Sequence, residues 1–296
     1  MELKSLYTVK AIVETGSYQK AAKVLNYAQS TITFQIKQLE NELSVKLFEK
    51  NRNKMELTQE GKEVLPMINK VIDATEELLC FKNNENEIRG TLKVALPETL
   101  VTYKMQPIFR EFKEKAPNVK LSLQVMNCYA IYEQMLNGDI DIAIHYNIGK
   151  YPKSVITKNI DTYPLVLVSS TVLDECQRDF ISSNQKKSVC HIQNDPNALY
   201  MKIFNQYLKK KDITLETELE LWSIESIKLS VMSNLGVAFL PRFTVETELE
   251  QGVLNEINTD IINNEITAVY AYNKNKWQSP AMSLFLQIID DFYEIK

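Results

Sequence analysis

The chain has 296 residues, about twice the length of an average domain, so we expect two separate hydrophobic cores. Its composition, 45% hydrophobic and 24% charged with 7 Gly and 9 Pro, excludes a disordered or collagen-like chain. Its apolar runs are too short to cross a bilayer, and the charged N-terminal segment does not fit a signal peptide. We therefore expect a cytoplasmic protein with no membrane partner.

Motifs of the common enzyme and metal-protein classes are missing from the sequence. The seven glycines form neither a G-x-G-x-x-G turn nor a G-x-x-x-x-G-K loop, and no G-x-S-x-G or catalytic cysteine motif occurs. Four widely spaced cysteines and two histidines give no metal-binding spacing. We expect no catalytic residues, no metal, no cofactor and no enzymatic activity.

Charge is distributed unevenly along the chain. Residues 1–58 hold 9 Lys and Arg against 6 Asp and Glu, a net charge of +3. Residues 59–296 hold 25 against 32, a net charge of −7, and the two parts together give the total of −4. A small basic segment followed by a larger acidic one indicates that only the first binds nucleic acid.

Three short helices are predicted in the basic segment. Apolar residues recur at helical spacing before Gly16, which ends the first helix. Ser17 is expected to cap the second helix, which ends near Leu25. The third begins near Gln29 and buries an apolar stripe formed by Ile32, Ile36, Leu39 and Leu43. Two short helices joined by a tight turn predict a helix-turn-helix.

The opposite face of the third helix suits the major groove of DNA. It carries hydroxyls, amides, one cation and an aromatic ring, where a merely solvated face would alternate Glu and Lys. Phe34 fits a thymine methyl group, although it could instead contact another helix. The DNA-binding residues predicted on this helix are Gln29, Ser30, Thr31, Thr33, Phe34 and Lys37.

A basic turn follows the third helix. Residues 49–54 carry three cations between two short extended segments, which predicts a wing. Arg52 and Lys54 are expected to contact phosphates or the minor groove. Residues 1–58 are thus predicted to form an all-α winged helix-turn-helix domain.

A long helix is predicted from Thr58 to about Asn83, within a linker and hinge region at residues 59–89. Its apolar stripe is wide enough for two partners, which favours a dimer interface over packing on its own chain alone. The interface residues we expect are Val64, Ile68, Val71, Ile72, Leu78 and Leu79.

The remaining chain alternates strands with helices. This pattern predicts parallel βαβ units in an α/β domain over residues 90–296. Two Rossmann-like lobes are expected, one formed by about residues 90–161 and 266–296 and the other by about residues 162–265. Single helices are predicted over residues 99–115 and from Pro196 to about Lys210.

Several segments resemble LysR-type transcriptional regulators. They are GSYQKAA (16–22), AQSTITFQIKQLE (28–40), LSVKLFE (43–49), LTQEG (57–61), GTLKV (90–94), LNGDIDIAI (136–144) and LGVAFLP (235–241). The resemblance covers essentially the whole chain. Ala28, Gln29 and Ser30 replace the usual Ser, Gln, Pro, and Ser44 replaces Gly, which bears on base preference rather than on the fold.

The resemblance implies a regulator that represses or activates transcription from operator DNA as a homodimer or a dimer of dimers. The transcription machinery is a further candidate partner. The C-terminal domain is similar to periplasmic binding proteins, in which a small effector of unknown identity binds between two lobes.

Ligands of open parallel sheets bind beyond the carboxyl ends of the strands, where helices begin. Applied to this chain, that rule predicts effector-binding residues at Glu98, Thr99, Asn127, Cys128, Tyr129, His145, Tyr146, Asn194, Ile224 and Glu225. Two of these residues have a structural alternative. His145 could instead be a hydrogen-bonded hinge residue, and Glu225 could instead interact with the dipole of its own helix. Since no Arg is among them, a dicarboxylate is disfavoured, while helix N-termini could hold a single anion.

Two alternative functions fit the sequence less well. A free-standing solute-binding protein would have a signal peptide and no basic N-terminal segment. A thiol-based redox sensor would use Cys128, or Cys176 with Cys190, but their spacing lacks the close pair typical of peroxide-sensing relatives.

Overall fold

The computed structural model describes residues 2–51, 54–80 and 88–294. The chain divides into two compact units, Met1–Gly90 and Thr91–Lys296, each with its own core. Arg52 and residues 81–87 of the predicted linker and hinge region, including the end of the predicted long helix, lie outside the described residues. None of the described helices is long and apolar enough to span a membrane.

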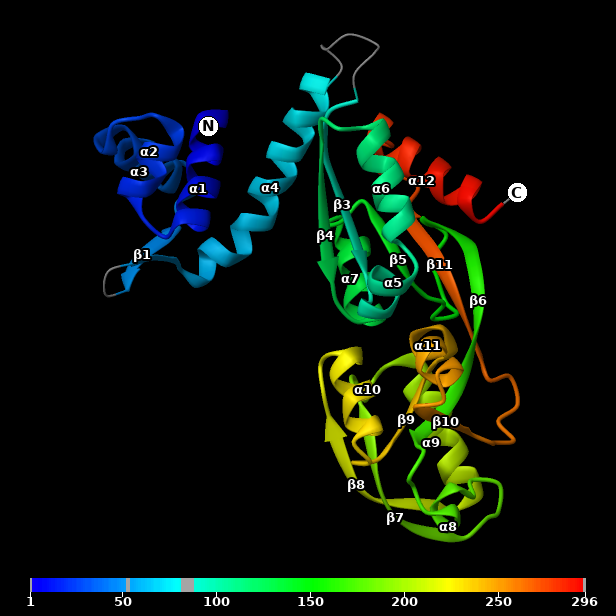
Figure 1. The fold of residues 1–296 in the computed structure, drawn as a ribbon. Helices are drawn as coiled ribbons and strands as arrows, with labels where there is room; N and C mark the ends of the chain where they lie inside the picture. Colours follow the sequence, from blue (N-terminus) through cyan, green and yellow to red (C-terminus); the bar gives the residue numbers. More distant parts are fainter. Residues whose placement is uncertain (1, 52–53, 81–87, 295–296) are drawn as a thin grey trace. The chain divides into compact units, whose positions relative to one another are not determined.

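The N-terminal unit has the predicted order of elements, which are α1 Leu3–Thr15, α2 Tyr18–Leu25, α3 Gln29–Leu43, β1 Phe48–Asn51, β2 Lys54–Leu57 and α4 Gln59–Cys80 (Figure 1). Gly16 ends α1 at φ 65°, a left-handed conformation that favours glycine, and its N–H donates to the Ile12 carbonyl oxygen. Ser44 takes the same conformation, at φ 56°, after α3. Ser17 precedes α2, but contrary to our expectation its side chain makes no capping hydrogen bond.

One hydrophobic core joins the helices of this unit. Its buried members are Leu6, Val9, Ala11, Ile12, Ala21, Ala22, Ile32, Ile36, Leu39, Leu47, Phe48, Ile68 and Ile72. Leu43 is not among them, since 37% of its surface is exposed. The prediction that Leu43 is buried was wrong because it is the last residue of α3, where the chain turns away from the core.

The C-terminal unit is an α/β structure with two lobes. The first lobe contains β3 Gly90–Leu96, α5 Glu98–Tyr103, α6 Gln106–Lys115, β4 Val119–Val125, α7 Cys128–Asn137, β5 Ile142–Tyr146, β11 Glu265–Asn273 and α12 Pro280–Phe292. The second contains α8 Glu175–Arg178, β7 Gln185–Gln193, α9 Leu199–Lys211, β8 Ile213–Glu220, α10 Ile224–Met232, β9 Val237–Pro241, η1 Arg242–Thr244, α11 Glu246–Glu250 and β10 Leu254–Ile257.

A single long strand, β6 Val155–Ser170, belongs to both lobes (Figure 1). Its first part pairs antiparallel with β11, and from Leu165 onward it pairs antiparallel with β9. The strand order is β4-β3-β5-β11-β6-β9-β7-β8, and β10 also pairs with β6. The two lobes are therefore joined by one continuous strand that is hydrogen-bonded to β11 in one lobe and to β9 in the other.

Two details differ from the predicted α/β pattern. The sheet is mixed rather than parallel, because β11 returns from the second lobe and runs antiparallel to both β5 and β6. The helix predicted over residues 99–115 is broken between Tyr103 and Gln106, since Pro107 cannot donate the backbone hydrogen bond that a continuous helix needs.

Candidate functional sites in the helix-turn-helix and between the lobes

Helix α3 presents the predicted groove-reading face to solvent. Its opposite side, with Ile32, Ile36 and Leu39, is fully buried. Gln29, Ser30 and Lys37 are exposed, while Thr31 and Thr33 are partly buried. Phe34 is 67% exposed and therefore contacts no other helix extensively. The Thr33 hydroxyl donates to the Gln29 carbonyl oxygen, 3.0 Å away, so its proton is already used within the helix.

Buried polar contacts fix α3 on the rest of the unit. The Thr8 hydroxyl of α1 donates to the Gln35 side-chain oxygen of α3 at 2.6 Å, and both residues are buried. Breaking a buried pair leaves an unsatisfied polar group, which costs about 1–3 kcal/mol. The exposed face therefore sits on a rigid support, as a base-reading surface requires.

The wing is a two-stranded antiparallel hairpin, with Phe48 opposite Leu57. The Glu40 carboxylate of α3 accepts the backbone N–H of Leu47 at 2.8 Å, which ties the base of the wing to the recognition helix. The Met55 N–H donates to the Gly16 carbonyl oxygen at 3.0 Å. Lys54 is exposed at the start of β2.

Helix α4 is anchored to this unit at its N-terminal end. The Thr58 hydroxyl accepts the N–H of Gly61 at 3.0 Å. A Cβ atom on Gly61 would lie 2.3 Å from the Leu47 carbonyl oxygen, so only glycine permits this close approach. Ile68 and Ile72 are buried in the core of their own unit, so their burial needs no second chain.

Three other apolar residues of α4 are exposed. Met67, Val71 and Leu78 are exposed by 65%, 38% and 72%. Val64 is partly buried against the core of the unit, and the side chain of Leu79 lies outside the described residues. The predicted interface stripe is thus divided between an inner side that packs on its own chain and an outer side that is uncovered.

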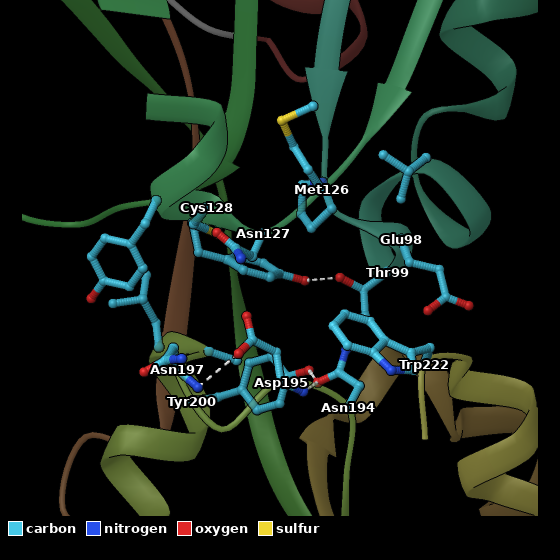
Figure 2. Close-up of a pocket in the computed structure, with 16 residues that line it drawn as sticks. Glu98, Thr99, Met126, Asn127, Cys128, Asn194, Asp195, Asn197, Tyr200 and Trp222 are labelled. Atoms are coloured by element: carbon cyan, nitrogen blue, oxygen red, sulfur yellow. Dashed lines mark hydrogen bonds between the residues drawn. The ribbon is translucent and has the colours of Figure 1, made fainter. Parts of the chain in front are cut away.

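A cavity of about 170 Å³ lies between the two lobes of the C-terminal unit (Figure 2). The first lobe contributes the turns before α5 and α7, and the second contributes the segment that leads into α9, with Trp222. The lining residues are Pro97, Glu98, Thr99, Val125, Met126, Asn127, Cys128, Tyr129, Tyr146, Asn194, Asp195, Asn197, Ala198, Leu199, Tyr200 and Trp222. Most of the predicted effector-binding residues are in this list, but His145, Ile224 and Glu225 are not.

His145 and Tyr146 show why neighbouring residues of one strand differ. Successive side chains of a strand point to opposite faces, so only Tyr146 lines the cavity. His145 is fully buried, with Nδ1 2.8 Å from the Tyr146 carbonyl oxygen, and burial lowers its pKa. The hydrogen bond agrees with the alternative of a hydrogen-bonded residue, while its predicted role as a hinge residue stays a prediction.

Glu98 connects the lobes. Its carboxylate oxygens accept the backbone N–H of Ile224, the first residue of α10, at 3.1 and 3.3 Å. The Ile224 N–H is one of the free donors at a helix start, and Ile224 was predicted to contact the effector. In the structure this N–H binds Glu98 instead. Burial raises the pKa of Glu98, against the effect of the hydrogen bond from Ile224.

Glu225 belongs to a second contact between the lobes, away from the cavity. The Tyr103 hydroxyl of α5 donates to Glu225 Oε1 at 2.6 Å, and Lys228 Nζ lies 2.8 Å from the same oxygen. Lys228 also pairs with Glu248 at 2.7 Å. Glu225 was predicted to contact the effector, but its carboxylate is bound by Tyr103 and Lys228 and does not line the cavity.

Most hydroxyl groups in the cavity have partners. The Tyr146 and Thr99 hydroxyl oxygens are 2.6 Å apart, and the Tyr200 hydroxyl donates to Asn194 Oδ1 at 2.9 Å (Figure 2). Burial raises the pKa of both tyrosines, so they are neutral at pH 7. The walls are thus preorganised before any ligand binds.

The segment that follows Asn194 lines the cavity although the sequence did not predict it. A helix was predicted from Pro196, whereas α9 begins at Leu199. The intervening turn places Asp195, Asn197 and Ala198 at the cavity, and Trp222 reaches it from the end of β8. Proline favours the first turn of a helix, but Pro196 lies three residues before the first helical residue, Leu199.

The cysteines have contrasting environments. Cys128 is buried and lines the cavity, and burial raises the pKa of its thiol to about 11. Cys176 is exposed, and Cys190 is partly buried. Since the thiolate is the reactive form, Cys128 is unsuited to oxidant sensing. Among the described residues, no three His, Cys, Asp or Glu side chains are grouped to hold a metal ion.

Family models match both units. The bacterial regulatory helix-turn-helix protein, lysR family, matches residues 3–62, and the LysR substrate binding domain matches residues 85–293. The chain belongs to the LysR family of transcriptional regulators.

Among curated relatives, the uncharacterized HTH-type transcriptional regulator YfiE of Escherichia coli (strain K12) is 38% identical over 99% of both chains. Two solved structures share the fold at 19% identity. A full-length OxyR variant from Pseudomonas aeruginosa covers 100% of this chain and 95% of its own, with a TM-score of 0.69. Full-length CbnR complexed with its target DNA covers 98% and 99%, with a TM-score of 0.66.

Proposed function

We propose that the interlobe cavity of this DNA-binding regulator binds a small effector, and that the effector changes operator binding by the N-terminal unit. The observation that carries the proposal is the cavity itself. It is lined by both lobes, and its size of about 170 Å³ is close to the roughly 150 Å³ of a cavity known to bind benzene. A ligand there would contact both lobes at once and favour one arrangement of them.

We further propose that α3 reads bases through Gln29, Ser30, Thr31, Thr33 and Phe34, while Lys37, Arg52 and Lys54 bind phosphates. The exposure of Phe34 and Lys37 on a helix held by buried contacts supports this assignment. The proposed place of action is the cytoplasm, with the transcription machinery as a further partner.

A homodimer, or a dimer of dimers, is the proposed assembly. Met67, Val71 and Leu78 lie on one face of α4, and an exposed apolar face of this kind is typical of an interface between helices. Leu78→Asp would bury an unpaired carboxylate in such an interface, so the variant should sediment as a monomer at micromolar concentration. Lys62→Asp, on another side of α4, should remain a dimer. Dimeric Leu78→Asp would contradict this interface.

The effector site is tested by filling the cavity. Ala198→Trp introduces a large ring at the start of α9, whereas Val172→Trp is a control at a position of the same lobe that is 70% exposed. Each protein is incubated with the low-molecular-mass fraction of a cell extract and examined by native mass spectrometry. The wild type and Val172→Trp should retain a small molecule, and Ala198→Trp should not. Equal retention by all three proteins would place the site elsewhere.

A further inference from the structure

One carboxylate of the interlobe cavity is only half satisfied. Asp195 Oδ1 accepts the backbone N–H of Asn197 at 2.8 Å, as in an ordinary turn before a helix. Asp195 Oδ2 is buried and has no hydrogen-bond partner. Figure 2 shows this carboxylate directed from the second lobe toward the segment of the first lobe that carries Asn127 and Cys128.

The charges around the cavity are all of one sign. Glu98 and Asp195 line it, and none of the lining residues that the structure describes is a Lys, Arg or His. Glu98 is already occupied by the N–H of Ile224. Lys202 lies beside the lining residue Tyr129, but its Nζ is engaged by the Tyr129 hydroxyl at 2.5 Å. A buried carboxylate oxygen without a partner is costly, so a ligand that brings a cation to Asp195 Oδ2 would be stabilised there.

Aromatic side chains line the same cavity as this carboxylate. Tyr146 of the first lobe and Tyr200 of the second meet edge to face with their ring centroids 6.5 Å apart. Trp222 also lines the cavity and is 80% exposed, so a bound ligand can cover its ring. Aromatic faces attract cations, which adds to the attraction of Asp195.

We infer that the effector carries a protonated amine that pairs with Asp195 Oδ2, on an apolar body no larger than one ring or a short branched chain. This inference rests on the proposed effector site. The N-termini of α7 and α9 also meet the cavity, so a carboxylate next to the amine can be accommodated. Plain amines and α-amino acids share the ammonium group, and the experiment separates them.

The test compares ligands of matched shape by the change in tryptophan fluorescence, to which the cavity residue Trp222 contributes. The first set is phenethylamine, 3-phenylpropionate, 2-phenylethanol and phenylalanine, and the second is isopentylamine, 4-methylpentanoate, isopentanol and leucine. At millimolar concentrations, an amine or amino acid of at least one set should bind the wild type at least tenfold more tightly than the matched carboxylate and alcohol. Preference for the amine over the amino acid, or the reverse, identifies the source of the ammonium group.

A variant then tests the role of Asp195. Asp195→Asn retains an acceptor for the Asn197 N–H but removes the charge, so amine affinity should fall at least tenfold. Asp174→Asn, at an exposed position of the same lobe, should bind amines as the wild type does. Equal binding of amines by Asp195→Asn, or no amine binding to the wild type at millimolar concentration, would overturn the inference.

Failure of this inference and failure of the proposed site give different results. If carboxylates or alcohols bind best and Ala198→Trp abolishes their binding, the cavity is the effector site and the ammonium class is wrong. If binding of any of these compounds is unaffected by Ala198→Trp, the cavity is not their site, and both proposals fail together.

Discussion

Protonation of His191 should weaken the C-terminal unit in mild acid. His191 lies in β7, is 1% exposed and has an Nε2 atom without a hydrogen-bond partner. Its ring packs edge to face on Phe204, with centroids 5.0 Å apart. Burial lowers the pKa of His191 from 6.5 to about 4, because the charged form would lose its hydration without gaining a partner.

The size and sign of the effect follow from that difference in pKa. The pKa of His191 is 6.5 in the unfolded chain and about 4 in the folded chain. At roughly 1.4 kcal/mol per pKa unit, this difference corresponds to a loss of about 3 kcal/mol in the free energy of unfolding at low pH. The unfolded chain binds the proton more readily, so stability is highest above pH 6.5 and falls as the pH drops toward 4. Between pH 7 and pH 5 the loss due to His191 should be about 2 kcal/mol.

Urea unfolding at the two pH values measures this loss. Both tryptophans, Trp222 and Trp277, lie in the C-terminal unit, so fluorescence follows that unit. In His191→Gln the change in unfolding free energy between pH 7 and pH 5 should be smaller by about 2 kcal/mol, whatever its absolute stability. His145→Gln should also reduce the pH dependence, since burial lowers the pKa of His145 too. An unchanged pH dependence in His191→Gln would refute the reasoning.

Three further predictions concern packing, thiol reactivity and DNA binding. A Cβ on Gly236 would lie 2.2 Å from the Cys190 carbonyl oxygen, so Gly236→Ala should separate β9 from β7 and cost about 2 kcal/mol, and an unchanged melting temperature would refute this. At pH 7 Cys176 should react with iodoacetamide before Cys128, whose thiol has a pKa raised to about 11, and peptide mass spectrometry that finds the reverse order would revive Cys128 as a thiol sensor. Lys37→Ala should lower the salt dependence of DNA binding by about one phosphate contact, and an equal slope in titrations against salt would remove Lys37 from the interface.

Local signals predicted most of the elements, and tertiary pairing explains the exceptions. Helical spacing and Gly16 located the first three helices within a few residues. The first part of β6, residues 155–164, is polar and half-exposed, so its strand state depends on pairing with β11 and not on a local pattern. The antiparallel return of β11 could not be predicted, since chain order does not specify direction in a mixed sheet.

The location of the cavity at the strand ends agrees with the prediction, but some of the individual residues predicted there do not line it. The rule for strand ends found Glu98 and Tyr146, because parallel strands β3 and β5 end at the same edge, and it found Asn127 after the neighbouring strand β4. It also included His145, since a strand end does not reveal which of two successive side chains faces the cavity. Asp195 was missed because its role depends on where α9 begins.

Reciprocal coupling between effector and operator tests the central claim most directly. An operator is selected by the full chain from a random DNA pool, and an effector is taken from the compounds that bind the interlobe cavity. Operator affinity is measured with and without saturating effector, and effector affinity with and without saturating operator. If the cavity controls DNA binding, the two affinities change by the same factor, about fivefold or more. Operator and effector affinities that are each independent of the other ligand would contradict the account.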